Sequence, residues 1–366
     1  MRPRVRRREH TVVLFIAFLF ILSLIAVNAI WPQGFTVFIA IGGTLGALMV
    51  LYEVRLTKQI AQAEFIRDLQ TSFASDPNIG ELWRRLLLDE KIGPDDRHLM
   101  SSYLTFFETV FLLQDRGALD LTMTDDLFRN RFFTAVGHPV VLREALLKKV
   151  GAFTNIHELI SVWHQHLMTH RKPIHDGYYS YIEAVLEAKG FEIVELNKGH
   201  LDGLLALQAS VLDSLEHREW LRENPAEALL ECLHSDGSHV ALGALRDGKL
   251  VAAAILYDGA TGKESIKRYL TDDEVLMRES INLKLVLADP AYRRHRLGAT
   301  LVKLLEQRAY KLGRREILCT IHPRNVPSSS LFKGLGYSRA RIVSTTYGKR
   351  AVYARSLRSI DAHWIR

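Results

Sequence analysis

The chain of 366 residues has only two cysteines, Cys232 and Cys319, and they lie far apart. Two isolated thiols cannot build a disulfide framework, and their separation does not match the spacing of metal ligands. A fold held together by disulfides is therefore not expected, and a reducing compartment suits the chain. His166 and His170 lie four residues apart, but no carboxylate or cysteine accompanies them, so no metal is expected.

Acidic residues are outnumbered by basic ones, which gives a net charge of +7. Such a charge suits a nucleic acid only where it gathers on one surface. Here it is concentrated in two separate places. Five arginines stand within the first ten residues, ahead of an apolar run, and a second cluster spans Arg293–Arg296. Each cluster has another explanation, so no nucleic-acid partner is expected.

Two uncharged apolar stretches, Thr11–Trp31 and Phe35–Tyr52, are separated by a short break that contains proline and glycine. A helix needs about 20 apolar residues to cross the hydrocarbon core of a bilayer. The pair therefore predicts a transmembrane helical hairpin over residues 11–53, after a basic N-terminus of residues 1–10. A cleaved signal peptide is the alternative, but it leaves the second stretch unexplained.

The arginines before the first stretch predict that both ends of the hairpin, and everything after it, face the cytoplasm. The predicted location is thus the cytoplasmic membrane, with two helices in the bilayer, both termini cytoplasmic and lipid as a partner. Gly42 and Gly46 form a pair of small residues that would let two such helices pack closely. A homodimer through these helices, or through the C-terminal domain, stays open.

Residues 54–172 carry apolar side chains at spacings of three, four and seven, which predicts an all-α cytoplasmic domain. Its aromatic-rich segments around Phe106 and Phe132 faintly resemble a bacterial helical family of unassigned function that follows membrane helices. That resemblance implies no chemistry. Residues 173–190, with Pro173 and an Asp-Gly pair, are predicted to be a linker and a short helix.

From Phe191 the pattern changes to alternating strands and helices, including a hairpin with an Asp-Gly turn at Asp247. The predicted order over residues 191–358 is β-α-α-β-β-β-α-β-α-β-β, and residues 359–366 form a tail. The fold class predicted for the chain is therefore multidomain. It combines the transmembrane hairpin, the all-α middle domain and an α/β domain with a mixed, mostly antiparallel sheet.

One segment of this domain, Leu287–Leu301, reads LADPAYRRHRLGATL, which is a strand end followed by a basic loop and the start of a helix. A tight loop at the positive end of a helix points backbone N–H groups at a diphosphate. Arg293, Arg294 and Arg296 add charge that suits phosphate. If the loop needs a positive φ at Arg296, arginine carries a steric penalty there.

A second segment, Asn325–Tyr337, reads NVPSSSLFKGLGY. The two segments together resemble the GNAT superfamily of acetyltransferases over nearly half of the chain. The first is similar to the family signature Gln/Arg-x-x-Gly-x-Gly/Ala, with Arg293 in the first position and Gly298 in the last. The second is similar to Asn-x-x-Ala/Ser-x-x-Leu-Tyr-x-x-x-Gly-Phe/Tyr, with Asn325 in place and Phe332 where the family has tyrosine.

This resemblance implies the GNAT fold, with its sheet split between the fourth and fifth strands. It also implies acetyl-CoA or another acyl-CoA as co-substrate and an unidentified amine as acceptor, with direct transfer between them. A non-catalytic acyl-CoA sensor coupled to the membrane is the alternative. The residues that it implies for cofactor binding are Leu285, Leu287, Arg293, Arg294, His295, Arg296, Leu297, Gly298, Ala299, Thr300, Asn325, Ser328 and Phe332.

The resemblance also suggests three catalytic residues. The backbone N–H of Leu287 would polarise the thioester carbonyl, and Glu279 is the candidate base, since Asp289 is expected to cap the loop. Phe332 cannot donate a proton, so Tyr337 is the candidate acid. Ser328, Ser329, Tyr347 and bulk water remain alternatives, because a thiolate is a tolerable leaving group.

Overall fold

The computed structural model describes residues 23, 25–26, 32–149, 151–234, 239–259 and 262–357. They fall into two compact units that divide between Gln70 and Thr71, inside helix α2 (Pro32–Ser75). The first unit consists mainly of the long helical stretch before this point. The second unit contains the remaining helices and the whole sheet. The finer domain boundaries stay predictions.

The first unit does not contain the predicted membrane hairpin. Among the residues that the structure describes, no helix is both long and apolar enough to cross a membrane. The hairpin prediction is therefore wrong, and with it the predicted location, and the lipid partner is left without support. Most of the predicted first span, Thr11–Trp31, lies outside the described residues.

The second unit begins with an all-α region in which aspartates cap two of the helices. Asp76 caps α3 by accepting from the N–H of Asn78 and Ile79, and Asp120 caps α5 in the same way through Thr122. The helices are α3 (Pro77–Leu87), α4 (Arg97–Asp115), α5 (Leu121–Val136), α6 (Pro139–Val141) with a π-helical turn (Leu142–Leu146), α7 (Thr154–Thr169) and α8 (Asp176–Glu187).

Aromatic side chains fill the core between these helices. Phe107, Phe132 and Trp163 are fully buried, and the rings of Phe132 and Trp163 stack with their centroids 5.0 Å apart. Burying a side chain of this size stabilises the fold by about 1.5–3 kcal/mol. The aromatic-rich segments of the sequence thus serve packing.

One buried carboxylate ties this core together. Asp125 on α5 is 1% exposed and accepts hydrogen bonds from Trp163 Nε1 at 2.7 Å and from Lys172 Nζ at 2.6 Å. Arg129 Nη1 lies 3.3 Å from the same carboxylate. Because these donors come from α5, α7 and the segment after α7, Asp125 fixes how the three elements meet.

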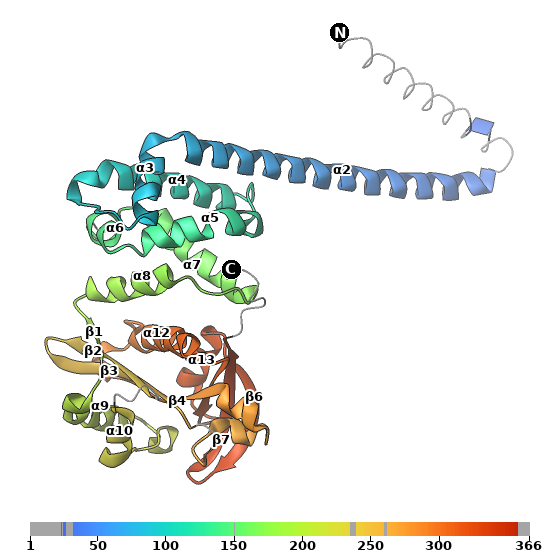
Figure 1. Cartoon of the computed structure of the whole chain (residues 1–366). Helices are drawn as coiled ribbons and strands as arrows, with labels where there is room; N and C mark the ends of the chain where they lie inside the picture. Colours follow the sequence, from blue (N-terminus) through green and yellow to red (C-terminus); the bar gives the residue numbers. More distant parts are fainter. Residues whose placement is uncertain are drawn as a thin grey trace. The chain divides into compact units, whose positions relative to one another are not determined.

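A seven-stranded mixed sheet follows the helical region, in the order β1-β2-β3-β4-β5-β7-β6 (Figure 1). Neighbouring strands are antiparallel except β4 and β5, which are parallel. The elements are β1 (Glu192–Glu195), α9 (Leu201–Asp213), α10 (Ala226–Cys232), β2 (Val240–Arg246), β3 (Lys249–Tyr257), α11 (Glu274–Arg278), β4 (Ser280–Ala288), α12 (Leu297–Lys311), β5 (Glu316–Ile321), α13 (Val326–Gly334), β6 (Ser338–Thr345) and β7 (Gly348–Ser356).

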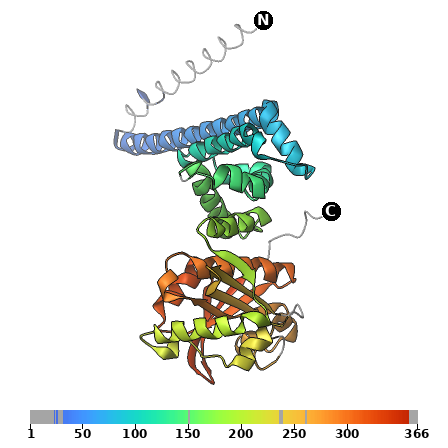
Figure 2. The same cartoon turned by 90° about the vertical axis from the view of Figure 1, so that its left-hand side faces the viewer.

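Helices cover both faces of this sheet (Figure 2). On one face, α9 and α10 pack against the apolar side chains of β3 and β4, including Leu285 and Leu287. On the other, α12 lies against β4 where Gly298 meets Val286. Side chains alternate between the two faces of a strand, so consecutive residues of β4 anchor different helices.

The parallel pair β4 and β5 separates after a short contact. Ser280, Ile281 and Asn282 pair with residues 316–318, and beyond them β4 pairs only with β3. The register between β3 and β4 shifts near this point: Leu283 pairs with Leu256 but Leu285 pairs with Ile255, which leaves Lys284 as an extra residue. Such a bulge bends its strand, and here it opens a gap between β4 and β5.

Replacing Asp125 with asparagine is expected to destabilise the protein by about 2–3 kcal/mol, because Lys172 loses its buried counter-charge and Trp163 loses part of its acceptor. Urea unfolding followed by circular dichroism measures this. The matched control is Asp126→Asn, since the Asp126 side chain is 80% exposed. Equal stability of the two variants would show that the Asp125 network does not hold the helical region.

Candidate active site

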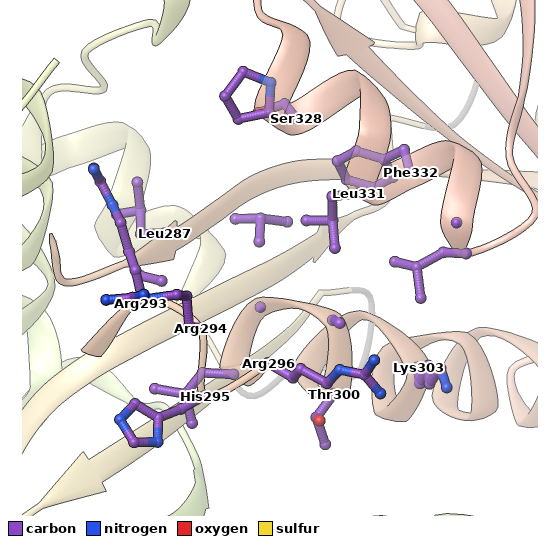
Figure 3. A pocket seen from close by; sticks show the side chains of 18 of the residues that line it. Leu287, Arg293, Arg294, His295, Arg296, Thr300, Lys303, Ser328, Leu331 and Phe332 are labelled. Carbon is purple, nitrogen blue, oxygen red and sulfur yellow. The ribbon is translucent and has the colours of Figure 1, made fainter. Parts of the chain in front are cut away.

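A cavity of about 1240 Å³ lies in the gap between β4 and β5 and continues along α12. Its floor is formed by Leu283–Ala288 of β4 and Cys319–Ile321 of β5. The loop Tyr292–Arg296, the first turns of α12 and one side of α13 form its walls, as Figure 3 shows in part. Side chains of α7 and α8 line it as well.

The loop between β4 and α12 has an unusual backbone. Asp289 Oδ1 accepts from the N–H of Ala291 at 2.9 Å, so this carboxylate caps the loop. Arg294 and Arg296 both have left-handed backbones, with φ of 72° and 61°. The steric penalty anticipated for arginine at position 296 therefore applies, and such a conformation costs about 1–2 kcal/mol for a residue with a Cβ.

The strained residue Arg296 directly precedes α12, and its side chain does not cap the helix. The first N–H groups of a helix have no partner within the helix, and they carry its positive partial charge. Leu297 is buried and fixes the start of α12, so the N–H groups of Gly298 and Ala299 border the cavity. This arrangement suits an anion such as a phosphate.

Three basic residues of the loop, Arg293, His295 and Arg296, have different surroundings. Arg293 Nη2 donates to Ser214 Oγ at 2.8 Å, which ties the loop to the end of α9. Arg296 extends along α12 in the direction of Lys303, away from Arg293 (Figure 3). His295 packs edge-on against Phe191 with ring centroids 5.4 Å apart. The basic cluster is therefore partly structural and partly directed along the cavity.

Gly298 allows the helix to approach the sheet closely. A Cβ built at this position would lie 3.3 Å from Val286 Cγ1, which is tighter than ordinary contact. An added Cβ would require Val286 or the helix to give way by a few tenths of an ångström. The glycine at the end of the loop signature thus permits close packing of α12 on β4.

Helix α13 supplies the opposite wall. Asn325 Oδ1 caps the helix by accepting from the N–H of Ser328 at 3.0 Å. Phe332, which lines the cavity, is 5% exposed, and the centroid of its ring lies 5.0 Å from that of Tyr337. Tyr337 is itself buried below α13 and is not part of the cavity lining, and burial raises the pKa of its hydroxyl. The structure does not support Tyr337 as the acid.

The predicted base is also misplaced. Glu279 lies before β4, at the closed end of the split, where its carboxylate is 2.8 Å from Arg315 Nη1. It does not line the cavity. Among the described residues, the carboxylates that do line it are Glu158 on α7 and Glu216 in the segment after α9. Neither carries a sequence motif that would have revealed it.

The backbone of β4 points in alternating directions, which decides the oxyanion donor. The N–H of Asp289 donates to Val251 O on β3 at 2.8 Å, and Leu287 pairs with Ala253 two residues earlier. Antiparallel ladders alternate, so the N–H of Leu287 also faces β3. The N–H groups of Val286 and Ala288 face the split instead. The backbone N–H of Leu287 is therefore not placed to donate to a thioester carbonyl in the split, whereas those of Val286 and Ala288 are.

Comparison with known proteins identifies the family of the domain that contains most of this cavity. Residues 206–337 match the acetyltransferase (GNAT) family model. Residues 206–337 therefore form a GNAT-family acetyltransferase domain. The family match begins within α9 and ends at Tyr337, so it includes the split, the basic loop and α13. The preceding helical region is unassigned, and no curated protein matches the chain.

Solved structures of acetyltransferases are similar to the same half of the chain. An N-acetyltransferase from Staphylococcus aureus has 14% identity and a TM-score of 0.37, covering 46% of this chain and 99% of its own. A Thermoplasma acidophilum N-acetyltransferase in complex with coenzyme A has 19% identity and a TM-score of 0.35, with coverages of 45% and 98%. A structure from Salmonella typhimurium with its cofactor acetyl-CoA has 18% identity and a TM-score of 0.37, with coverages of 47% and 96%.

Replacing Arg296 with glycine is expected to stabilise the GNAT domain by about 1 kcal/mol, because glycine adopts the left-handed backbone without a steric penalty. Urea unfolding of the intact chain measures the change. Arg293→Gly is the control, since Arg293 has an ordinary φ of −59° and glycine there only adds freedom to the unfolded chain. If Arg296→Gly is no more stable than Arg293→Gly, the loop is not strained at this position.

Proposed function

We propose that the chain transfers an acyl group, acetyl by default, from acyl-CoA to an amine that enters the split between β4 and β5. The observation that carries this proposal is the cavity itself, which joins the open split to the uncapped, positive N-terminus of α12. A thioester in the split and a diphosphate at the helix end would then occupy one continuous space. No membrane anchor forms part of the proposal.

The exposed edge of β4 supplies the electrophilic assistance in this proposal. The N–H groups of Val286 and Ala288 face the split and have no strand to pair with there. One of them would hold the extended arm of the co-substrate, and the other would donate to the thioester carbonyl as its oxygen gains charge. A backbone donor fixed in a sheet is already oriented, so little reorganisation accompanies the reaction.

Glu216 replaces Glu279 as the base in this proposal. It follows α9 and lines the cavity on the side of Trp220 and Leu221. The amine that attacks the thioester must lose a proton, and a carboxylate at this mouth would accept it directly or through water. Phe332 leaves no acid at the usual position, so the departing thiolate takes its proton from water.

A sensor that binds acyl-CoA without turnover is the second candidate function. Two observations favour it: Phe332 presents a ring without a proton donor, and Arg296 stands in a strained backbone. Neither feature removes the surface that would bind acyl-CoA. Phe332 bears only on the chemical step, and the strain at Arg296 bears only on the affinity for acyl-CoA. Release of CoA in the presence of a panel of amines separates the two functions.

The intact chain is expected to bind acetyl-CoA in isothermal titration calorimetry, and Gly298→Trp is expected to abolish binding, because the indole forces α12 away from Val286. The control is Gly80→Trp on α3, where an added Cβ meets nothing within 4 Å. Circular dichroism checks that both variants fold. Unchanged affinity of the Gly298 variant would overturn the assignment of the site.

Once an acceptor amine is found, Glu216→Gln is expected to lower kcat/KM by about 100-fold, because the amine proton has no acceptor. The acidic limb of the pH–rate profile should disappear with the carboxylate. Glu219→Gln is the control, since Glu219 stands nearby in the same segment but does not line the cavity. A profile for Glu216→Gln that keeps its acidic limb would exclude Glu216 as the base.

A further inference from the structure

The outer part of the cavity lies beyond the region that matches the family. Its wall there is formed by His157, Ser161 and His164 of α7 and by Tyr178 and Tyr181 of α8. All of these precede residue 206, where the family match begins. The helical region therefore contributes directly to the space that begins at the CoA loop. This part of the wall continues along α12, away from the split.

Helix α8 is held along α12 by polar contacts at several points (Figure 1). Asp176, at the start of α8, accepts from Gln307 Nε2 at 2.6 Å and lies 3.3 Å from Lys311 Nζ. Further along, the Lys303 ammonium donates to the Tyr178 hydroxyl. Arg355 reaches α7 from β7 through Met168 Sδ at 2.8 Å. The helical wall is thus fixed to the acetyltransferase domain at several places.

Lys303, on α12 beside this wall, is a partly buried cation that has no ion pair among the described residues. Its ammonium lies 5.1 Å from the centre of the Tyr178 ring, and no described carboxylate lies within ion-pair distance of it. The nearby carboxylate, Glu306, is buried and already paired with Arg355. The pKa of Lys303 is lowered to about 8, mainly by burial; Glu306 opposes this shift, and the positive charges of Arg355 and Arg296 add to it. A cation placed in this way favours an anionic ligand.

The spacing of residues along α12 indicates which anionic group Lys303 would bind. Lys303 is five residues beyond Gly298, which is about 7.5 Å along a helix axis. The diphosphate of CoA would lie at the start of the helix, so Lys303 is too far along to share it. CoA carries one further phosphate, a phosphomonoester on its ribose, a few ångströms from the diphosphate. Arg296 extends from the loop toward the same place (Figure 3).

We propose that Lys303, oriented by Tyr178 and assisted by Arg296, binds the ribose phosphomonoester of CoA, and that α7 and α8 enclose the nucleotide end of the cofactor. This rests on the proposed function, since it takes CoA as the ligand. His164 stacks on Tyr178 with ring centroids 4.1 Å apart, and His157 Nδ1 lies 2.7 Å from the Tyr181 hydroxyl. These rings give the wall flat faces beside the site for the nucleotide.

Calorimetry of the intact chain with CoA and with dephospho-CoA, which lacks the phosphomonoester, tests the proposal. Wild-type protein should bind dephospho-CoA at least about 10-fold more weakly, as expected for a lost charge-assisted contact. Lys303→Gln should remove this preference, and Lys303→Arg should keep it. The matched control is Lys311→Gln, which removes a charge from the same helix and weakens the contact with Asp176, but lies outside the cavity.

Four different results would overturn the proposal or the proposed function on which it rests. Equal affinities of the wild type for the two ligands would show that no residue reads the phosphomonoester. A preference that survives in Lys303→Gln would place the contact elsewhere. A preference lost equally in Lys311→Gln would attribute the effect to loosening of α8. Failure to bind either ligand would instead defeat the proposed function.

The pH dependence adds a readout that a structural role would not give. The lysine must be protonated to attract the phosphate, so the preference for CoA should be complete below the pKa of about 8 and should decrease as the pH rises through it. Lys303→Arg should keep its preference over the same pH range. A wild-type preference that does not change between pH 7 and pH 9.5 would contradict the role of Lys303.

Hydrogen exchange tests the enclosure by α7 and α8. Binding of CoA is expected to slow amide exchange across residues 154–187 as well as in the loop before α12. Dephospho-CoA should protect the loop but protect these two helices less. Protection confined to the loop and the first turn of α12 with both ligands would show that the helical region takes no part in binding.

Discussion

The separation of β4 from β5 beyond Asn282 is the constraint on which the rest of the site depends. Two parallel strands that stop pairing leave backbone donors exposed, and buried donors without partners are destabilising. The bulge at Lys284 bends β4 away from its neighbour, and β3 continues to hold the other edge. Because α12 is packed on β4 through Gly298, the helix end and the exposed edge stay in fixed relation. The cavity follows from this geometry.

The charges around the cavity are arranged so that a ligand, and not the protein, would balance them. Arg293 is held by Ser214, and Arg355 is paired with the buried Glu306. Arg296 and Lys303 instead lie along the cavity, with no described ion pair. Partial burial without a counter-ion raises the free energy of a cation, and a bound phosphate would lower it again. The strain at Arg296 is consistent with a loop shaped for binding.

The helical region lines part of the cavity, although its sequence carries no motif that indicates this. Its own core is aromatic and is tied together by the Asp125 network, and its helices α7 and α8 line the cavity. Through Asp176, Tyr178 and Met168 it touches α12 and β7. The faint resemblance of its sequence to a helical family carried no chemistry, and none of these contacts was foreseeable from periodicity.

Local patterns in the sequence were informative where one segment carries its own signal. The basic loop ending in Gly298, the Asp289 cap and the steric penalty at Arg296 all concern neighbouring residues, and short-range sterics and hydrogen bonding decide them. The apolar run Phe35–Tyr52 led to a membrane prediction that was wrong, since no helix among the described residues is long and apolar enough to cross a membrane. Function was indicated by resemblance, which the family match now supports.

The sequence by itself therefore indicated the order of helices and strands in the C-terminal half apart from α11, while its phosphate-binding loop and acyl-CoA co-substrate stay predictions. Only the tertiary structure decided that Val286 and Ala288, rather than Leu287, face the split, because that depends on the pairing of β4 with β3. It also removed Glu279 and Tyr337 from the site and brought in Glu216, Lys303 and Tyr178. These residues come from distant parts of the chain, and no local pattern records which of them will meet.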